Sequence, residues 1–453
     1  LLFMLVFSLV LTACGGGSSK NADEQAESEG NTGETNESSS NKEIVIEYWS
    51  GPVWRNVEGV DSPEFGDWEK AKIAEFEEQN PNVTINFQSI PWDGIEEKTV
   101  VALAGGNPPD ILVDSIDRRL MKYVEDGMNE PIGDFIEDEL DDFNADMIEN
   151  VSKDGEIYGI PVSMNPEYFY LNTALFKEKG LEHLIPTDDR MWTIDEMYDA
   201  LKQVSGDGVY GTALWAANEQ GDEMNLMHFY ARGAEQWSED LSEIVLDQYP
   251  ESVETLEMFL QMLDEGIMAP GPATTAALDA VELFKQNKIA MIPWGNNLWE
   301  MVEEGREDGS THPDVEMFGM APPHAEGVTP KVASAFHGFQ VFKQEDPEKR
   351  EMIKKFVQFM VQPEHVKALA KSYDALPARA SASYEFENPE MNAAMEVVGE
   401  LPLANTGVAS PFYGDVRQMW YPELQAVLLG QKEPEQALKD YAEKANAFLS
   451  ENQ

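Results

Sequence analysis

The part of the chain after residue 43 alternates β-rich runs with helical patterns, and this alternation strongly constrains the fold. Runs rich in β-branched and aromatic residues occupy 44–49, 83–87 and 109–113, and helical patterns occupy 68–79 and 93–104. We expect Asp93 to cap the second of these helices. Consecutive β and α segments are typical of βαβ units. They predict an α/β fold with a mainly parallel sheet whose strand ends carry the site.

Later segments continue this pattern. Thr193 and Glu196 have the spacing of a capping box for a helix that ends near Val204, and amphipathic helices are expected over 352–361 and 434–449. The stretch 206–211 fits Gly-x-Gly-x-x-Gly. It follows a helix and precedes a β-like run, the reverse of a dinucleotide-binding loop, so we predict a turn. The chain has 453 residues, 42% of them hydrophobic, which is enough for two lobes.

The N-terminal segments predict where the chain resides. Residues 1–11 form an apolar run of signal-peptide length, too short to span a membrane. Residues 11–15, Leu-Thr-Ala-Cys-Gly, resemble the lipobox of bacterial lipoproteins, so Cys14 is the predicted lipidation site, with a buried core cysteine as the alternative. No Met or basic region precedes Leu1, so we expect 1–13 to be a signal peptide truncated at its start. Residues 14–42 are polar and predict a disordered tether.

Charge and motif content narrow the function. Asp and Glu number 85 against 31 Lys and Arg, giving a formal net charge of -54, which disfavours nucleic acid and anionic lipid as partners. A P-loop, a His-Glu-x-x-His helix and a Gly-x-Ser-x-Gly elbow are absent from the sequence, and the six histidines lack metal-ligand spacing. We therefore predict no catalytic residues, no metal and no cofactor. A glycosidase carboxylate pair cannot be nominated among so many acids.

A collinear series of motifs then resembles a known family. Residues 154–161 look like its "G-x-x-Y-G-x-P" segment, and 170–176 stand in place of "Y-Y-N-x-x-L-F". Residues 284–291 resemble "F-x-x-G-K-x-A-M", with Asn287 where glycine is usual. Further matching segments are 107–118, 123–127, 334–342, 375–379 and 428–438. Over roughly 44–450 the chain resembles the family 1 extracellular solute-binding proteins, the maltose-binding-protein-like sugar-binding lipoproteins of ABC transporters.

The resemblance implies a two-lobed α/β fold of the periplasmic-binding-protein type, with a hinge and a ligand cleft between the lobes. Crossings between lobes are expected near 161–165, 332–336 and 382–389. The predicted lobes are 43–162 with 335–383, and 163–334 with 384–453. It also implies a monomer outside the bacterial cell membrane that binds a carbohydrate, without turnover, for ABC transporter permease subunits. A membrane anchor on Cys14 fits this role.

A sugar site needs aromatic rings for the apolar ring face and polar groups for the hydroxyls. The resemblance places Asp117 and Arg118 at an Asp-Arg pair of the family, and Asn297 where the family carries a tryptophan, so the aromatic platform is expected to have moved to Trp294 or Trp299. The complete set of candidate ligand-binding residues is Trp49, Trp54, Trp92, Asp114, Asp117, Arg118, Asn165, Glu167, Tyr168, Trp215, Trp294, Asn297, Trp299, His337, Arg379 and Trp420.

Each candidate has a structural alternative. Asp114 and Asp117 could form surface ion pairs, Asn165 to Tyr168 could be hinge structure, and Trp294 and Trp299 could be core. Only Arg118, Arg379 and Arg417 are obvious basic candidates near a cleft, which favours a neutral oligosaccharide over an anionic one. Two other functions stay open at this point: a secreted polysaccharide-cleaving enzyme, and a surface solute receptor without a transport role.

Overall fold

The structure is a computed structural model that describes residues 42–60 and 62–452. The predicted signal peptide, Cys14 and all of the predicted tether except Lys42 lie outside the described residues. The side chains of Asp93 and Asp117 also lie outside them. Within the described part of the chain, no helix combines the length and the apolar character that a membrane crossing requires.

The predicted βαβ start is confirmed. Its elements are β1 (Ile44–Ser50), α1 (Asp67–Gln79), β2 (Val83–Ser89), α2 (Trp92–Ala104) and β3 (Ile111–Ser115). β1 pairs in parallel with both β2 and β3, as crossover connections through α1 and α2 require. The expected cap at Asp93 is wrong, because α2 begins one residue earlier and Pro91 occupies the N-cap position. Proline before the first turn removes an amide that would have no helical partner.

The prediction of a mainly parallel sheet is wrong for the pairings of the two long central strands, which are antiparallel. The sheet has the strand order β2-β1-β3-β10-β6-β8-β7. Its later strands are β6 (Gly159–Asn172), β7 (Tyr210–Thr212), β8 (Ile289–Gly295), β9 (Met317–Met320), β10 (Ala333–Val341) and β11 (Leu376–Pro377). β10 runs antiparallel to β3 and β6, and β6 runs antiparallel to β8 and β9. The two long strands β6 and β10 traverse the molecule in opposite directions, so their neighbours cannot all be parallel.

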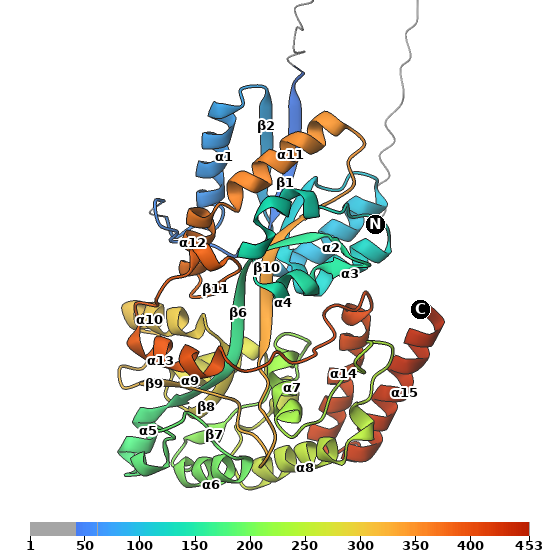
Figure 1. The fold of residues 1–453 in the computed structure, drawn as a ribbon. Helices are drawn as coiled ribbons and strands as arrows, with labels where there is room; N and C mark the ends of the chain where they lie inside the picture. Colours follow the sequence, from blue (N-terminus) through green and yellow to red (C-terminus); the bar gives the residue numbers. More distant parts are fainter. Residues whose placement is uncertain (1–41, 61, 453) are drawn as a thin grey trace, which may run out of the picture. The chain divides into compact units, whose positions relative to one another are not determined.

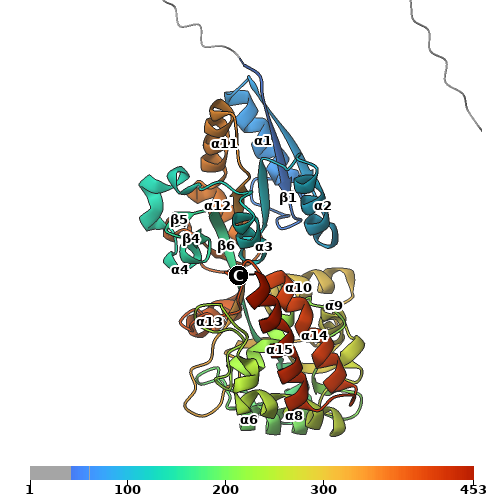
Figure 2. The ribbon, with the colours of Figure 1, turned by 90° about the vertical axis from the view of Figure 1, so that its right-hand side faces the viewer.

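The buried side chains form two large hydrophobic cores, one toward each end of the β6–β10 pair. The first is built from residues between 44 and 162 and between 336 and 382. The second is built from residues between 168 and 333 and between 386 and 449. Figure 1 shows β6 and β10 passing from the elements of the first core to those of the second, and Figure 2 shows the elements of the two cores from the side. A smaller cluster around Trp49, Tyr123 and Phe342 lies beside the first core.

Helices cover each core. The first core is covered by α1, α3 (Ile116–Glu125), α4 (Ala145–Asn150), α11 (Pro347–Met360) and α12 (Pro363–Lys371), and α2 packs on the smaller cluster through Ile95. The second is covered by α5 (Thr173–Glu178), α6 (Ile194–Val204), α7 (Asp222–Tyr230), α8 (Pro250–Asp264), α9 (Ala277–Lys285), α10 (Leu298–Asp308), α13 (Pro389–Val398), α14 (Tyr413–Leu428) and α15 (Pro434–Asn452).

Two local predictions are confirmed in detail. Thr193 and Glu196 form the predicted capping box of α6: the Thr193 hydroxyl accepts from the Glu196 amide at 3.2 Å, and the Glu196 carboxylate accepts from the Thr193 amide at 2.8 Å. The stretch 206–211 is a turn, in which Gly206 and Val209 exchange amide hydrogen bonds of 2.9 and 3.1 Å. The turn leads into β7, so it does not open a helix as a dinucleotide-binding loop does.

Glu69 is an unusual member of the first core. It lies in the first turn of α1 with only 1% of its surface exposed, close enough to Tyr48 of β1 for the two groups to interact electrostatically. Burial raises the pKa of Glu69 to about 7. A carboxyl whose pKa is raised by folding binds its proton more tightly in the folded state. Stability is therefore lost as pH rises from the ordinary pKa of 4.5 through 7.

We expect Glu69→Gln to remove this loss. Relative to the variant, the native protein should lose about 3 kcal/mol of unfolding free energy between pH 4.5 and pH 8, because each pKa unit corresponds to about 1.36 kcal/mol. Urea unfolding of both proteins at pH 5, 6, 7 and 8 measures the difference, and acids common to both proteins cancel. Parallel pH profiles would show that Glu69 ionises normally in the folded protein.

Candidate functional site

Polar side chains gather where β6 and β10 pass between the two cores. Asn165 and Glu167 lie on β6, and His337 lies on β10, all three buried. The antiparallel register places Ala335 opposite Asn165 and Ala333 opposite Glu167, with His337 opposite Ser163. Buried polar groups are costly in a strand unless they are paired or serve a ligand. This position makes the crossing the first candidate for a site.

Aromatic rings from the first lobe's elements surround His337. The His337 ring lies 6.1 Å from the Trp92 ring and 5.3 Å from the Tyr373 ring, measured between centroids. The Trp92 indole lies against Gly51, where an added Cβ would be 2.5 Å from the ring. Trp92 is nevertheless 39% exposed, so one of its edges or faces is open to solvent. Burial and the charge of Arg118 lower the pKa of His337 to about 3, so the imidazole is neutral at physiological pH.

An ion pair joins the elements of the two cores at this point. Arg118 of α3 donates to the carboxylate of Glu223 in α7. Glu223 also lies 3.4 Å from Arg417 of α14, and Arg417 donates to both carboxylate oxygens of Asp222 at 2.7 to 3.0 Å. Burial raises the pKa of Asp222, against the opposing charge of Arg417. Burial opposes ionisation of Glu223 as well, but the charges of Arg118 and Arg417 outweigh it and lower the pKa of Glu223.

A second hydrogen-bond network fixes Asn165 from the second lobe's side. The side-chain oxygen of Asn165 accepts a hydrogen bond from the backbone N–H of Asn296 at 2.8 Å. The side-chain NH₂ of Asn165 donates to the side-chain oxygen of Asn297 at 3.3 Å. The Tyr168 hydroxyl donates to the Asn296 side chain and accepts from the Trp299 indole at 3.2 Å. Asn297, at the position where the resemblance leads us to expect a tryptophan, therefore contacts Asn165 instead of providing a ring. Gly295 is needed beside them, because a Cβ there would lie 2.5 Å from the Asn165 nitrogen.

The remaining tryptophans are mostly packed inside. Trp215 and Trp294 make an edge contact with centroids 5.9 Å apart, and together with Trp299 they belong to the second core. Trp54 is fully buried in the first core, and Trp49 lies in the smaller cluster under Lys98. Of the candidate platforms, Trp92 is thus the exposed one.

Three further candidates, Arg379, Trp420 and Asp114, have described side-chain partners outside this group. Arg379 is buried among the elements of the first core. It donates to Asp142 and Glu139 at 2.7 Å and to the Val361 backbone carbonyl at 2.8 Å. Trp420 packs against Phe229 and Tyr441 in the second core. Asp114 accepts two hydrogen bonds from Arg119 at 2.7 and 2.8 Å. Asp117 has its backbone in α3, and its side chain is outside the description.

We call the crossing of β6 and β10 with the side chains around it, namely Trp92, Arg118, Asn165, Glu167 and His337, the junction. Two further residues of the junction were missing from the candidate ligand-binding residues predicted from the sequence. Glu223 stands 105 positions from its partner Arg118, and Tyr373 follows α12 in a segment that carries no sugar-binding motif. The only sequence signal for Glu223 is the acidic pair Asp222–Glu223 after Gly221, which is typical of a helix start.

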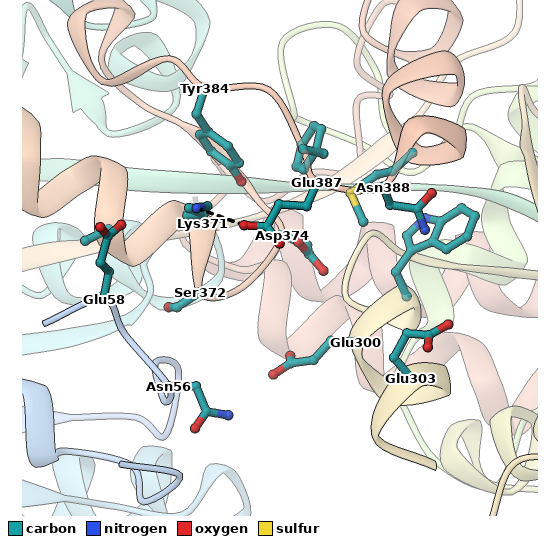
Figure 3. A pocket seen from close by; sticks show the side chains of 14 residues that line it. Asn56, Glu58, Glu300, Glu303, Lys371, Ser372, Asp374, Tyr384, Glu387 and Asn388 are labelled. Atoms are coloured by element: carbon teal, nitrogen blue, oxygen red, sulfur yellow. Dashed lines mark ion pairs between the residues drawn. The ribbon is translucent and has the colours of Figure 1, made fainter. Parts of the chain in front are cut away.

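A pocket of about 440 Å³ opens beside the junction, lined by residues from the elements of both cores. Figure 3 shows Glu300 and Glu303 of α10 on one side, and Lys371 paired with Glu387 at 3.1 Å. Burial raises the pKa of Glu300 to about 7 and that of Asp374 to about 6. The residues that line the pocket are Asn56, Glu58, Trp299, Glu300, Glu303, Ala368, Lys371, Ser372, Asp374, Tyr384, Phe386, Glu387, Asn388 and Met391.

The pocket is bridged at its edge by an ion pair. Arg55, from the loop after β1, lies 2.7 Å from Glu304 and 3.5 Å from Glu300 of α10. Trp299 is the one residue of the sequence-based set that lines the pocket. The described charge contacts between elements of the two cores therefore include Arg118 with Glu223, Arg55 with Glu304, and Lys371 with Glu387.

Comparison with known proteins identifies the family. Residues 71–397 match the model of the family described as bacterial extracellular solute-binding protein. The chain belongs to this family. A binding protein of Brucella abortus is 26% identical to this solute-binding protein over 390 residues, covering 84% of this chain and 89% of the relative. The diacetylchitobiose binding protein DasA of Streptomyces coelicolor is 24% identical over 369 residues, covering 79% of each.

A solved structure supports the architecture of this solute-binding protein. It is an ABC substrate-binding protein from Listeria monocytogenes in complex with cycloalternan, with a TM-score of 0.69 and 23% identity. The match covers 90% of this chain and 99% of that chain. The predicted family and the predicted two-lobed α/β fold are therefore both confirmed.

Proposed function

We propose that this solute-binding protein captures a neutral oligosaccharide between its two lobes and presents it to the permease subunits of an ABC importer. The observation that carries the proposal is the convergence of polar and aromatic side chains from both lobes at the β6–β10 crossing. The proposed lobes are residues 43–162 with 335–383, and 163–334 with 384–453. The proposed anchor on Cys14 rests on the sequence of residues 11–15 alone.

The chemistry of the junction suits a sugar. The exposed ring of Trp92 can stack on the apolar face of a pyranose, and Arg118, Asn165 and Glu167 can hydrogen-bond its hydroxyls. His337 is uncharged at physiological pH, so it can exchange neutral hydrogen bonds with hydroxyl groups. The Streptomyces relative and the Listeria structure, by their names, bind carbohydrates, which supports the same class of ligand here.

The mechanism we propose is hinge closure. A ligand that contacts Trp92 on one lobe and Asn165 on the other is bound more tightly by the closed form than by the open form, so it shifts the population toward closure. The hinge would lie in β6 and β10, with the segment between Ala382 and Phe386 as the third connection between the two cores. A ligand that contacted only one lobe would drive no closure.

Calorimetric titration tests this proposal with maltotriose, diacetylchitobiose, cellotriose and arabinotriose, set against spermidine and a tripeptide. We expect saturable binding of at least one oligosaccharide, without new reducing ends after incubation. Binding of spermidine or the tripeptide while every sugar fails would contradict the proposal, and new reducing ends would favour a polysaccharide-cleaving enzyme.

Gly295→Ala connects that binding to the junction. The added methyl group displaces the Asn165 amide without removing any polar group, so we expect affinity for the bound sugar to fall by about tenfold or more. Gly133→Ala is the matched control, because its Cβ would meet only ordinary contacts with Ile157 in the first lobe. Equal sugar affinities for Gly295→Ala and Gly133→Ala would show that Asn165 does not belong to the sugar-binding site.

A further inference from the structure

Two arginines and a helix start converge at Glu223. α7 begins at Asp222, directly after Gly221 in a left-handed conformation, so the positive end of the helix dipole lies at these two acids. Arg118 approaches Glu223 from the first lobe, and Arg417 approaches from α14. Figure 1 shows α7 and α14 on the same side of β6 and β10. Guanidinium groups at the amide end of a helix are the usual elements of an anion-binding site.

In this chain the anion is supplied by the protein itself. The Glu223 side chain is 5% exposed and is held by both arginines, and the Asp222 carboxylate accepts three hydrogen bonds from Arg417. The four groups carry two positive and two negative charges when all are ionised. The arginine that the family resemblance assigns to ligand binding, Arg118, thus already has a carboxylate partner.

We propose that Glu223 is a specificity-determining residue that excludes anionic sugars by occupying, with its own carboxylate, the anion-binding position formed by Arg118, Arg417 and the start of α7. A uronate, sugar phosphate or sulfate entering the junction would have to displace a buried, doubly paired carboxylate and leave it without a partner, which is strongly unfavourable. A neutral hydroxyl adds no charge to the group and displaces nothing. This inference rests on the proposed function, because it concerns the same ligand-binding junction.

A purely structural ion pair is the competing explanation. In that case Glu223 would hold the two lobes together, and its removal would change stability or closure without changing the charge preference of the site. The two explanations differ in one measurable property, the affinity for anions. Glu223→Gln keeps the shape and an acceptor oxygen while removing the charge, so it isolates that property.

The experiment measures calorimetric binding of sulfate and of trigalacturonate to the native protein and to Glu223→Gln. The native protein is expected to give no saturable signal with either probe. The variant should bind trigalacturonate with an affinity at least about tenfold above the detection limit that bounds the native protein, and that affinity should fall as sodium chloride is raised. The double variant Arg118→Gln with Glu223→Gln should lose that gain.

Glu254→Gln is the matched control. It removes the same charge from α8, where Glu254 pairs with Arg232 at 3.4 Å, and should leave anion binding unchanged. Unchanged anion affinity in a folded Glu223→Gln that still binds its neutral sugar would overturn this inference alone. If that variant does not fold, native protein that binds trigalacturonate as tightly as any neutral trisaccharide overturns it. A gain of anion binding with no sugar bound by the native protein would support Glu223 while contradicting the proposed function.

Discussion

Replacing Arg417 by methionine is expected to lower the free energy of unfolding by about 3–5 kcal/mol, the usual cost of removing one partner from a buried ion pair. Arg417 donates to Asp222 at 2.7 to 3.0 Å and also to the Glu219 carbonyl. Arg118, Asp222, Glu223 and Arg417 form one group of ion pairs. Without Arg417, the two buried acids stay adjacent and Arg118 is the remaining arginine of the group. Two neighbouring acids in such a place repel each other and are poorly hydrated.

Urea unfolding monitored by tryptophan fluorescence measures this loss. Lys202→Met is the control, because Lys202 pairs with Glu265 at 2.7 Å on the surface, and an exposed pair contributes at most about 1 kcal/mol. Adding Asp222→Asn to Arg417→Met should restore part of the stability, since it removes the charge that has lost its partner. Equal losses for Arg417→Met and Lys202→Met would mean that the acids at the start of α7 are solvated.

The sequence was informative about the fold wherever periodicity and caps were local. The β-rich and helical patterns of residues 44–113 correspond to β1 through β3, and the Thr193–Glu196 box starts α6 as expected. Strand direction could not be obtained in this way. β6 is buried along nearly its whole length, so it shows no alternation, and nothing local shows that β10 pairs with it about 170 positions later.

The candidate site was predictable only in part, for a related reason. Trp92, Arg118, Asn165 and His337 could be proposed because they belong to motifs or follow strands near the expected crossings. Arg379 also lies in a motif, yet its guanidinium joins Asp142 and Glu139 inside the first lobe, and motif position alone does not separate these two uses of an arginine. The partnership of Arg118 with Glu223 depends on the distant approach of α3 to α7, which no local pattern records.

The β6–β10 crossing makes one further demand on the sequence, at Gly338. The register of the two strands shifts between His337 and Gly338. A Cβ at Gly338 would overlap the carbonyl oxygen of Ile160 and would lie 2.9 Å from the Cα of Pro161. Both are backbone atoms of the partner strand, which cannot rotate away as a side chain can, so β6 and β10 would have to separate.

Gly338→Ala is therefore expected to lower the free energy of unfolding by more than about 3 kcal/mol, the upper range for overpacking a buried position. Gly414→Ala is the matched control: its Cβ would meet nothing within 4 Å inside α14, so it should be neutral or slightly stabilising. Urea unfolding of both variants measures the difference.

If Gly338→Ala is as stable as Gly414→Ala, the two strands are not held at their observed separation. If it folds with reduced stability but loses sugar binding, the displacement has reached His337, the preceding residue on β10. The crossing is then both the connection between the lobes and part of the ligand site. That result would explain why polar residues are placed on the two strands that join the cores, since a ligand bound there contacts the hinge itself.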